Sequence, residues 1–185
     1  DRGEPVADLD FANAGTNDWA SLVEGVQQIA SLGSPGPLYD MSGDWMPIVG
    51  GDDDTSCPST VVLARTYGDG RVVALGDDGF FVQEMPLDNA RFLTNVTDWL
   101  DVNDGREVRY TTGHSEVIRH AQIAGLATIL AGDGYSVSPL PSSITAQSLA
   151  ATSVLIVGNA WEDFTAEEIE VVRQFVNSGG GLWLA

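Results

Sequence analysis

Residues 154–185 constrain the fold more strongly than any other segment of this chain. They open with an apolar run, Val154–Val157, that is too short for a helix and ends at a glycine, the pattern of a strand buried on both faces. Thr165 and Glu168 then have the spacing of a capping box, so a helix is expected to start there. The apolar side of this helix recurs at helical spacing and consists of Ile169, Val172, Phe175 and Val176.

The helix is expected to end at the glycines 179–181, which lead directly into a second apolar run, Leu182–Ala185. Strand, helix and strand in this order predict two parallel strands joined by a crossover helix. Such a unit occurs in sheets that helices cover on both faces, and the ligands of such sheets bind beyond the carboxyl ends of the strands. The chain is therefore predicted to be an α/β protein.

The first part of the chain predicts a helix followed by an irregular region. Apolar residues between Trp19 and Ala30 recur at helical spacing, and Gly33 would end that helix. Residues 38–41 have the composition of a short strand. The glycine, aspartate and proline content of residues 42–58 favours an exposed loop.

A β-hairpin and a second helix are predicted next. Two β-branched runs, 60–67 and 71–76, flank a glycine-aspartate-glycine turn, which is typical of a hairpin. Asp88 stands where it would cap a helix whose apolar stripe ends at Leu100. The polar residues 101–106 that follow are the candidate internal boundary within a single domain that spans residues 1–185.

Strands and helices alternate three times after residue 106. Strands are predicted at 107–112 and 135–139, with a helix of apolar residues between them, and the unit at 154–185 completes the series. This alternation predicts a three-layer, doubly wound, mainly parallel sheet of Rossmann-like type, with the hairpin as its N-terminal segment.

Charge and cysteine content exclude several classes of function. The net charge is −19, from 27 acidic residues against 8 basic ones, so nucleic acid and anionic membranes are not expected partners. Adaptation to a salty medium explains this acidity better than a cation-binding surface does, because the acids are scattered. The lone Cys57 excludes an internal disulfide and a cysteine zinc site, and it lacks the features of a nucleophile.

Several further expectations follow from the whole sequence. No apolar run reaches the length of a membrane span, and no signal peptide is visible. The chain begins without methionine, and its last apolar run has the form of a half-finished strand, so we expect it to be covalently linked to further domains of a larger protein. No cofactor and no metal ion are predicted.

The best local group of polar residues is His114, Ser115 and Glu116. It follows a predicted strand, at the position where open α/β sheets bind their ligands. His114 and Glu116 have the chemistry of a general base and its partner, or of metal ligands. The structural alternative is that Ser115 caps the next helix, Glu116 favours its dipole and His114 bonds to a neighbouring loop.

Acidic turns and loop tryptophans supply the other candidate binding residues. Asp77 and Asp78 follow a predicted buried strand, whereas the cluster at 52–54 has the pattern of a solvated loop. Trp45 and Trp161 lie in predicted loops, where exposed indole rings stack on sugars, although core packing is the simpler explanation for each.

Several of these motifs, taken in order, resemble class I glutamine amidotransferase-like domains. The motifs are Arg109-Tyr-Thr-Thr-Gly-His-Ser-Glu116, Gly134-Tyr-Ser-Val137, Val154-Leu-Ile-Val157, Phe164-Thr-Ala-Glu-Glu168 and Gly179-Gly-Gly-Leu182. The hairpin at 67–81 and the helix at 89–100 precede them here. That order is similar to the N-terminal accessory region of enhancin-like, mucin-degrading metallopeptidases.

This resemblance implies a non-catalytic accessory or recognition module of a larger secreted or surface protein, which binds a glycan or a protein partner. The zinc-peptidase motif His-Glu-x-x-His is absent from the sequence, and no complete catalytic constellation is present. The alternatives are an amidotransferase-like hydrolase whose nucleophile lies beyond Ala185, since the family places its cysteine after the equivalent strand, and a structural spacer. An extracellular or cell-surface location is implied with the first reading.

Overall fold

The computed structural model describes residues 4–5, 18–31, 35–50, 60–81, 87–116, 118, 120–141 and 143–185. Its centre is a seven-stranded sheet with the order β3-β4-β5-β9-β8-β6-β7, beside a two-stranded sheet of β1 and β2. The strands of both sheets are β1 (Glu4–Pro5), β2 (Gln28–Ile29), β3 (Met46–Gly50), β4 (Thr60–Tyr67), β5 (Gly70–Leu75), β6 (Glu107–Tyr110), β7 (Ser136–Pro139), β8 (Val154–Val157) and β9 (Gly181–Leu184).

Three α-helices pack against this sheet in the described part of the chain: α1 (Asn89–Leu100), α2 (His120–Ala131) and α3 (Ala166–Asn177). The described residues also contain two short 3₁₀ helices, η2 (Asp18–Val23) and η3 (Asp78–Phe81). None of the described helices has the length and apolar character needed to cross a bilayer.

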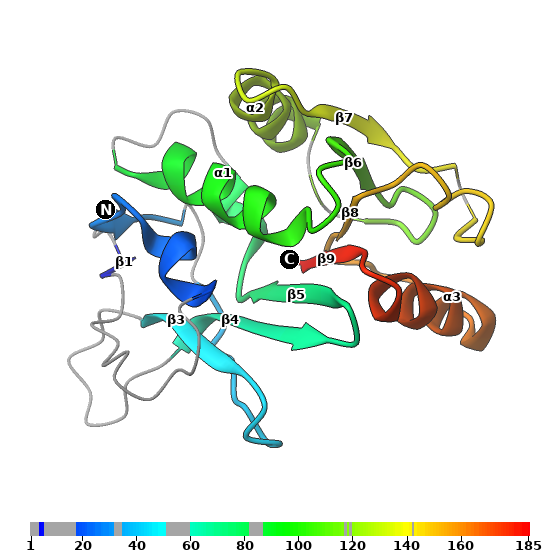
Figure 1. Cartoon of the computed structure of the whole chain (residues 1–185), viewed down its shortest axis with the longest axis horizontal. Helices are drawn as coiled ribbons and strands as arrows, with labels where there is room; N and C mark the ends of the chain where they lie inside the picture. The colour runs from blue at the N-terminus through cyan, green and yellow to red at the C-terminus, as the bar shows by residue number, and fades with distance from the viewer. Residues whose placement is uncertain are drawn as a thin grey trace.

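The predicted strand-helix-strand unit is confirmed. β8 and β9 are parallel neighbours, with Val154 opposite Gly181 and Val157 opposite Leu184, and β9 is the middle strand of the sheet (Figure 1). α3 connects them and begins with a complete capping box between Thr165 and Glu168, as the spacing of the two residues predicts.

The predicted hairpin is also confirmed, and it belongs to the same sheet. β4 and β5 are antiparallel, with Tyr67 opposite Gly70, and the turn between them needs a positive φ of 59° at Gly68, which glycine adopts without steric cost. β5 then pairs in parallel with β9. One sheet thus contains strands from both sides of residues 101–106.

Alternating side chains divide the core into two layers, one on each face of the sheet. Val73, Ile156 and Trp183 belong to the larger cluster, which contains the buried side chains of α1 and α2. Their neighbours along the same strands, Val72, Leu155 and Leu182, point to the other face and pack with α3. Figure 1 shows α3 set apart from α1 and α2, beyond β8 and β9. The fold is a mixed, mostly parallel sheet between helices, consistent with a Rossmann-like α/β protein.

The predicted helix up to Ala30 is wrong beyond its first turns. A 3₁₀ helix covers Asp18–Val23, and Gln28–Ile29 form β2. The cause is tertiary, because groups from α1 bind this backbone. The Asp88 carboxylate accepts hydrogen bonds from the amides of Gln27 and Gln28, at 2.8 and 3.2 Å, and makes no capping bond to its own helix, contrary to the prediction.

Two further expectations are corrected. The predicted loop at 42–58 contains edge strand β3, which was missed because Pro47 and the shifts in register break the alternation of a regular strand. α2 starts at His120, so Ser115 does not cap it. Cys57 and the aspartates 52–54 lie outside the described residues.

Candidate functional site

The loop after β6 carries the predicted group of His114, Ser115 and Glu116. The His114 side chain is largely buried, and its Nε2 lies 3.2 Å from Oε1 of Glu168, which completes the capping box of α3. The ring of Phe164 packs against the imidazole, with 4.1 Å between the ring centroids. The fold therefore joins the strand-to-helix loop of β6 to the start of α3.

Glu168 is the centre of this junction. Its carboxylate accepts hydrogen bonds from the amide and hydroxyl of Thr165, at 3.0 and 2.9 Å, and from the amide of Ile144 at 3.3 Å. The Thr165 amide, followed by the Thr165 hydroxyl, the Ile144 amide and His114, lowers the pKa of Glu168 to about 2, against the opposing effect of burial. Because an ionised carboxylate only accepts hydrogen bonds, Nε2 of His114 is the donor in this pair.

Ser115 and Glu116 complete the junction. Ser115 has a positive φ of 55° and donates from its hydroxyl to Oε1 of Glu162 at 2.7 Å. Glu116 accepts a hydrogen bond from the backbone amide of His114, at 2.9 Å, and the His114 carbonyl accepts from the amides of Trp161 and Glu162. These bonds hold the loops after β6 and β8 together, so His114 has a structural partner, and a ligand-binding role for the group stays a prediction.

Asp77 and Asp78 lie at the end of β5, separated from β6 by β9 and β8 in the sheet. Asp77 accepts a hydrogen bond from the hydroxyl of Ser31 at 2.5 Å. Burial raises the pKa of Asp78, and a hydrogen bond and charge repulsion from Asp77 raise it further. Strands in a sheet are roughly 4.8 Å apart, so these acids lie about 14 Å from the His114 loop and form a separate group.

The two candidate tryptophans lie at opposite ends of the strands. Trp161 follows β8 and is 77% exposed, at the carboxyl ends of the parallel strands. Trp45 precedes β3, which runs in the same direction as β5, so it lies toward the amino ends. The guanidinium of Arg65 covers the ring of Trp45 at 5.3 Å. A single ligand site containing both indoles is therefore excluded for a small sugar.

No group of three or more His, Cys, Asp or Glu side chains within the described residues is arranged to hold a metal ion. The junction at His114 combines one imidazole with the carboxylates of Glu168 and Glu116, each of which accepts at least one hydrogen bond. Oε1 of Glu116 is buried and has no partner within the described residues.

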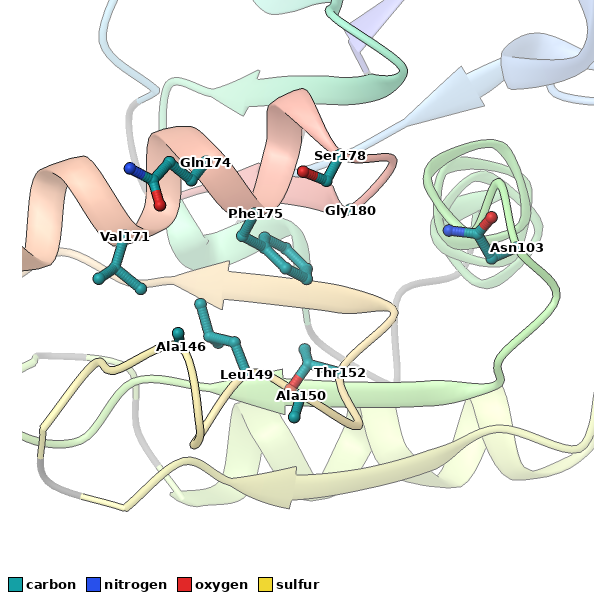
Figure 2. Close-up of a pocket in the computed structure, with 10 residues that line it drawn as sticks. All are labelled: Asn103, Ala146, Leu149, Ala150, Thr152, Val171, Gln174, Phe175, Ser178 and Gly180. Atoms are coloured by element: carbon teal, nitrogen blue, oxygen red, sulfur yellow. The ribbon is translucent and has the colours of Figure 1, made fainter.

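A pocket of about 340 Å³ lies beside the C-terminal end of α3 (Figure 2). All its side chains are uncharged, in a molecule with a net charge of −19. The pocket is lined by Asn103, Ala146, Leu149, Ala150, Thr152, Val171, Gln174, Phe175, Ser178 and Gly180. It combines one aromatic ring and aliphatic side chains with two amides and two hydroxyl groups.

The ring of Phe175 is held against the backbone of Gly180. A Cβ atom at position 180 would lie 2.4 to 2.6 Å from three atoms of that ring, so the close approach requires glycine. Asn103 reaches the pocket from the connection after α1 and donates from Nδ2 to the carbonyl of Gly179 at 3.1 Å. Oγ1 of Thr152 is buried and has no hydrogen-bond partner in the described part of the chain.

This pocket lies at the amino ends of the parallel strands, whereas the sequence predicts a ligand site at their carboxyl ends. Residues 146–152 lead into β8, residues 178–180 lead into β9, and Asn103 precedes β6, so the pocket is near the amino ends of three parallel strands. Sequence reasoning missed it because its walls are far apart in the chain. The available signal in the sequence is Gly180, because a glycine that the turn does not need indicates a close approach of another group, here the Phe175 ring.

Comparisons with known proteins support the fold alone. No protein-family model and no curated protein sequence matches this chain. Three solved structures are similar, all of IMPa, which is from Pseudomonas aeruginosa. IMPa in complex with an O-glycopeptide has a TM-score of 0.62 at 17% identity, and the IMPa metallopeptidase in complex with T-antigen has a TM-score of 0.64 at 18% identity.

Each of these two alignments covers 90% of this chain and 19% of the IMPa chain, so the present chain spans about a fifth of its structural neighbour. The match agrees, at the level of the fold, with the predicted resemblance to enhancin-like metallopeptidases. The glutamine amidotransferase-like assignment is not confirmed by it.

Proposed function

We propose that this chain is a non-catalytic recognition module of a larger secreted or surface protein, and that it binds a neutral saccharide in the pocket beside α3. The observation that carries the proposal is the uncharged lining of that pocket (Figure 2). In a chain with 27 acidic residues, a pocket of this size without a charged side chain favours an uncharged ligand.

The chemistry of the lining suits a sugar. The Phe175 ring, fixed by Gly180, offers an apolar surface to the C–H face of a pyranose. Asn103 keeps Oδ1 available while Nδ2 bonds to Gly179, and Gln174 donates from Nε2 to Glu170, which leaves its own carbonyl for a hydroxyl donor. The volume of about 340 Å³ is at the lower end of small-molecule pockets, as a monosaccharide or disaccharide requires.

The fold comparison supports this proposal. IMPa is bound to an O-glycopeptide in one similar structure and to T-antigen in another, although the present chain covers only 19% of either IMPa chain. We therefore propose that this chain has an extracellular or surface location and is covalently linked to further domains. We also propose that its fold is doubly wound and glutamine amidotransferase-like. Adaptation to a salty medium is proposed for the acidic surface.

Saturation-transfer NMR with lactose and N-acetylgalactosamine tests the function directly. Wild-type protein is expected to bind with dissociation constants on the order of 1 mM, and Ala146→Trp, which fills the pocket from an exposed turn, is expected to abolish the signal. Ala131→Trp places the same bulk at an exposed position of α2, outside this pocket, so it should bind as wild type does.

The loop tryptophans provide the competing outcome. If Trp161→Ala or Trp45→Ala removed saccharide binding while Ala146→Trp did not, the sugar would lie on an exposed indole, and the pocket assignment would be wrong. If no saccharide bound to the wild-type chain, glycan recognition itself would be rejected.

A further inference from the structure

Arg109 differs from three other arginines of the chain, which form salt bridges. Arg65, Arg106 and Arg173 are paired with Asp44, with Asp98 and Asp104, and with Glu170. Arg109 has no ion pair and no hydrogen bond within the described residues, and its Nε is buried without a partner. This occurs in a chain with 27 acidic residues.

Its position explains the missing partner. Arg109 alternates along β6 with Val108, which is buried in the core on the other face. Glu107 lies two residues away on the same side of the strand and forms no ion pair with it. A partly buried cation without a partner is unfavourable, because its lost hydration is not replaced, so an anion from outside would be stabilised here.

Arg109 faces a second pocket, of about 540 Å³, whose other lining side chains are all uncharged. Ser143, Thr145 and Ser148 form one wall. That wall is fixed by reciprocal bonds, since the Thr145 amide donates to the Ser148 hydroxyl at 2.9 Å and the Ser148 amide to the Thr145 hydroxyl at 3.0 Å. Among the described residues, no carboxylate lines the pocket to neutralise or repel an entering anion.

The two pockets adjoin each other. Ala150 lines both, so the turn at 145–151 separates the neutral pocket beside α3 from the pocket of Arg109. A ligand that bridged this turn would place an uncharged group on Phe175 and a single negative charge near Arg109. The chain as a whole has a net charge of −19, so an anionic group is repelled by most of the molecule and finds local attraction at Arg109.

We propose that Arg109 binds the carboxylate of an acidic sugar, such as a sialic or uronic acid, whose neutral neighbour occupies the pocket beside α3. This inference rests on the proposed function. Guanidinium and carboxylate groups form paired, charge-assisted hydrogen bonds, and the hydroxyl and amide side chains around Arg109 match the remaining hydroxyl groups of a sugar. An acidic peptide is the rival ligand and is less well matched, because the described lining of the pocket offers its several charges one cation.

NMR titration with lactose and sialyllactose, which differ by one acidic sugar, tests the proposal. Wild type is expected to bind sialyllactose at least about tenfold more tightly than lactose, as a charge-assisted pair implies. Arg109→Gln should bind both sugars equally, at the affinity of wild type for lactose, and Arg109→Lys should keep part of the preference. Arg65→Gln removes an arginine that already has a carboxylate partner and should keep the full preference.

Each of the other possible outcomes would reject a specific part of the proposal. An unchanged preference in Arg109→Gln, with its melting temperature equal to that of wild type, would remove Arg109 from recognition and leave the neutral pocket intact. If wild type bound neither sugar, both this inference and the proposed function would fail. Binding of a tetraglutamate peptide, with no preference for sialyllactose over lactose, would replace the acidic sugar by an acidic peptide.

Discussion

The junction between the His114 loop and α3 differs from the turn at 145–151 in how its polar groups are paired. At the junction, His114, Ser115 and Glu168 are hydrogen bonded, and Oε1 of Glu116 is buried without a partner in the described part of the chain. Beside the turn, Thr152 Oγ1 and Arg109 Nε are buried without partners in the same described residues. A polar group that has its partner stabilises the fold, whereas one without a partner is available to a ligand. His114 therefore has a structural partner, the pockets beside the turn are the site that we propose, and ligand binding by the His114 group stays a prediction.

The largest effect is expected for Glu168→Ala. This change removes the capping box and leaves the Ile144 amide and His114 without their acceptor, so the free energy of unfolding should fall by about 2–3 kcal/mol. Urea denaturation measures it. Glu167→Ala, one residue earlier and exposed, should change it by less than about 0.5 kcal/mol. Equal losses of unfolding free energy in the two variants would show that the hydrogen bonds of Glu168 do not hold these loops together.

The Gly180→Ala variant tests the pocket beside α3. The new methyl group would collide with the Phe175 ring, so the ring must move, at a cost of roughly 1–3 kcal/mol, and the pocket must change shape. Thermal unfolding and lactose binding report the two effects. Gly132→Ala, whose Cβ would meet a single carbonyl oxygen at 3.4 Å, is the control and should leave binding unchanged. Normal lactose binding in Gly180→Ala would contradict a role for the fixed ring.

The pH dependence of stability sharpens the description of the junction. The pKa of Glu168 is about 2 in the fold and ordinarily 4.5, so its ionised form stabilises the protein above about pH 5, and this contribution is lost as the pH falls toward 2. The difference in unfolding free energy between wild type and Glu168→Gln should therefore shrink over that range. A difference that stayed constant from pH 6 to pH 2 would be inconsistent with a lowered pKa.

The smallest effect is expected for Thr152→Val. Its hydroxyl has no partner within the described residues, so an isosteric methyl group should leave stability unchanged or raise it by less than about 0.5 kcal/mol. In Thr97→Val the same change removes a buried bond of 2.8 Å to the Leu93 carbonyl and should cost about 1 kcal/mol. Chemical denaturation of both variants compares them, and an equal loss in both would mean that Thr152 has a partner of its own in solution.

Local patterns predicted those elements whose signals lie within a few residues. The capping box at Thr165, the apolar run of β8 and the glycine turn of the hairpin at Gly68 are of this kind. The segment before Ala30 misled the prediction because its helical spacing is real, but the side chains of Asp88 and Asn89 bind its backbone groups instead. Helix propensity is a weak preference that such contacts override.

The sequence by itself determined the α/β class, the parallel pairing implied by residues 154–185 and the acidic character of the molecule, because periodicity, turn residues and charge are properties of neighbouring residues. Only the tertiary structure decided that His114 bonds to Glu168 and that Arg109 has no ion pair within the described residues. Whether a polar side chain has a partner depends on residues that the chain brings together from far apart. That difference separates His114 from Arg109.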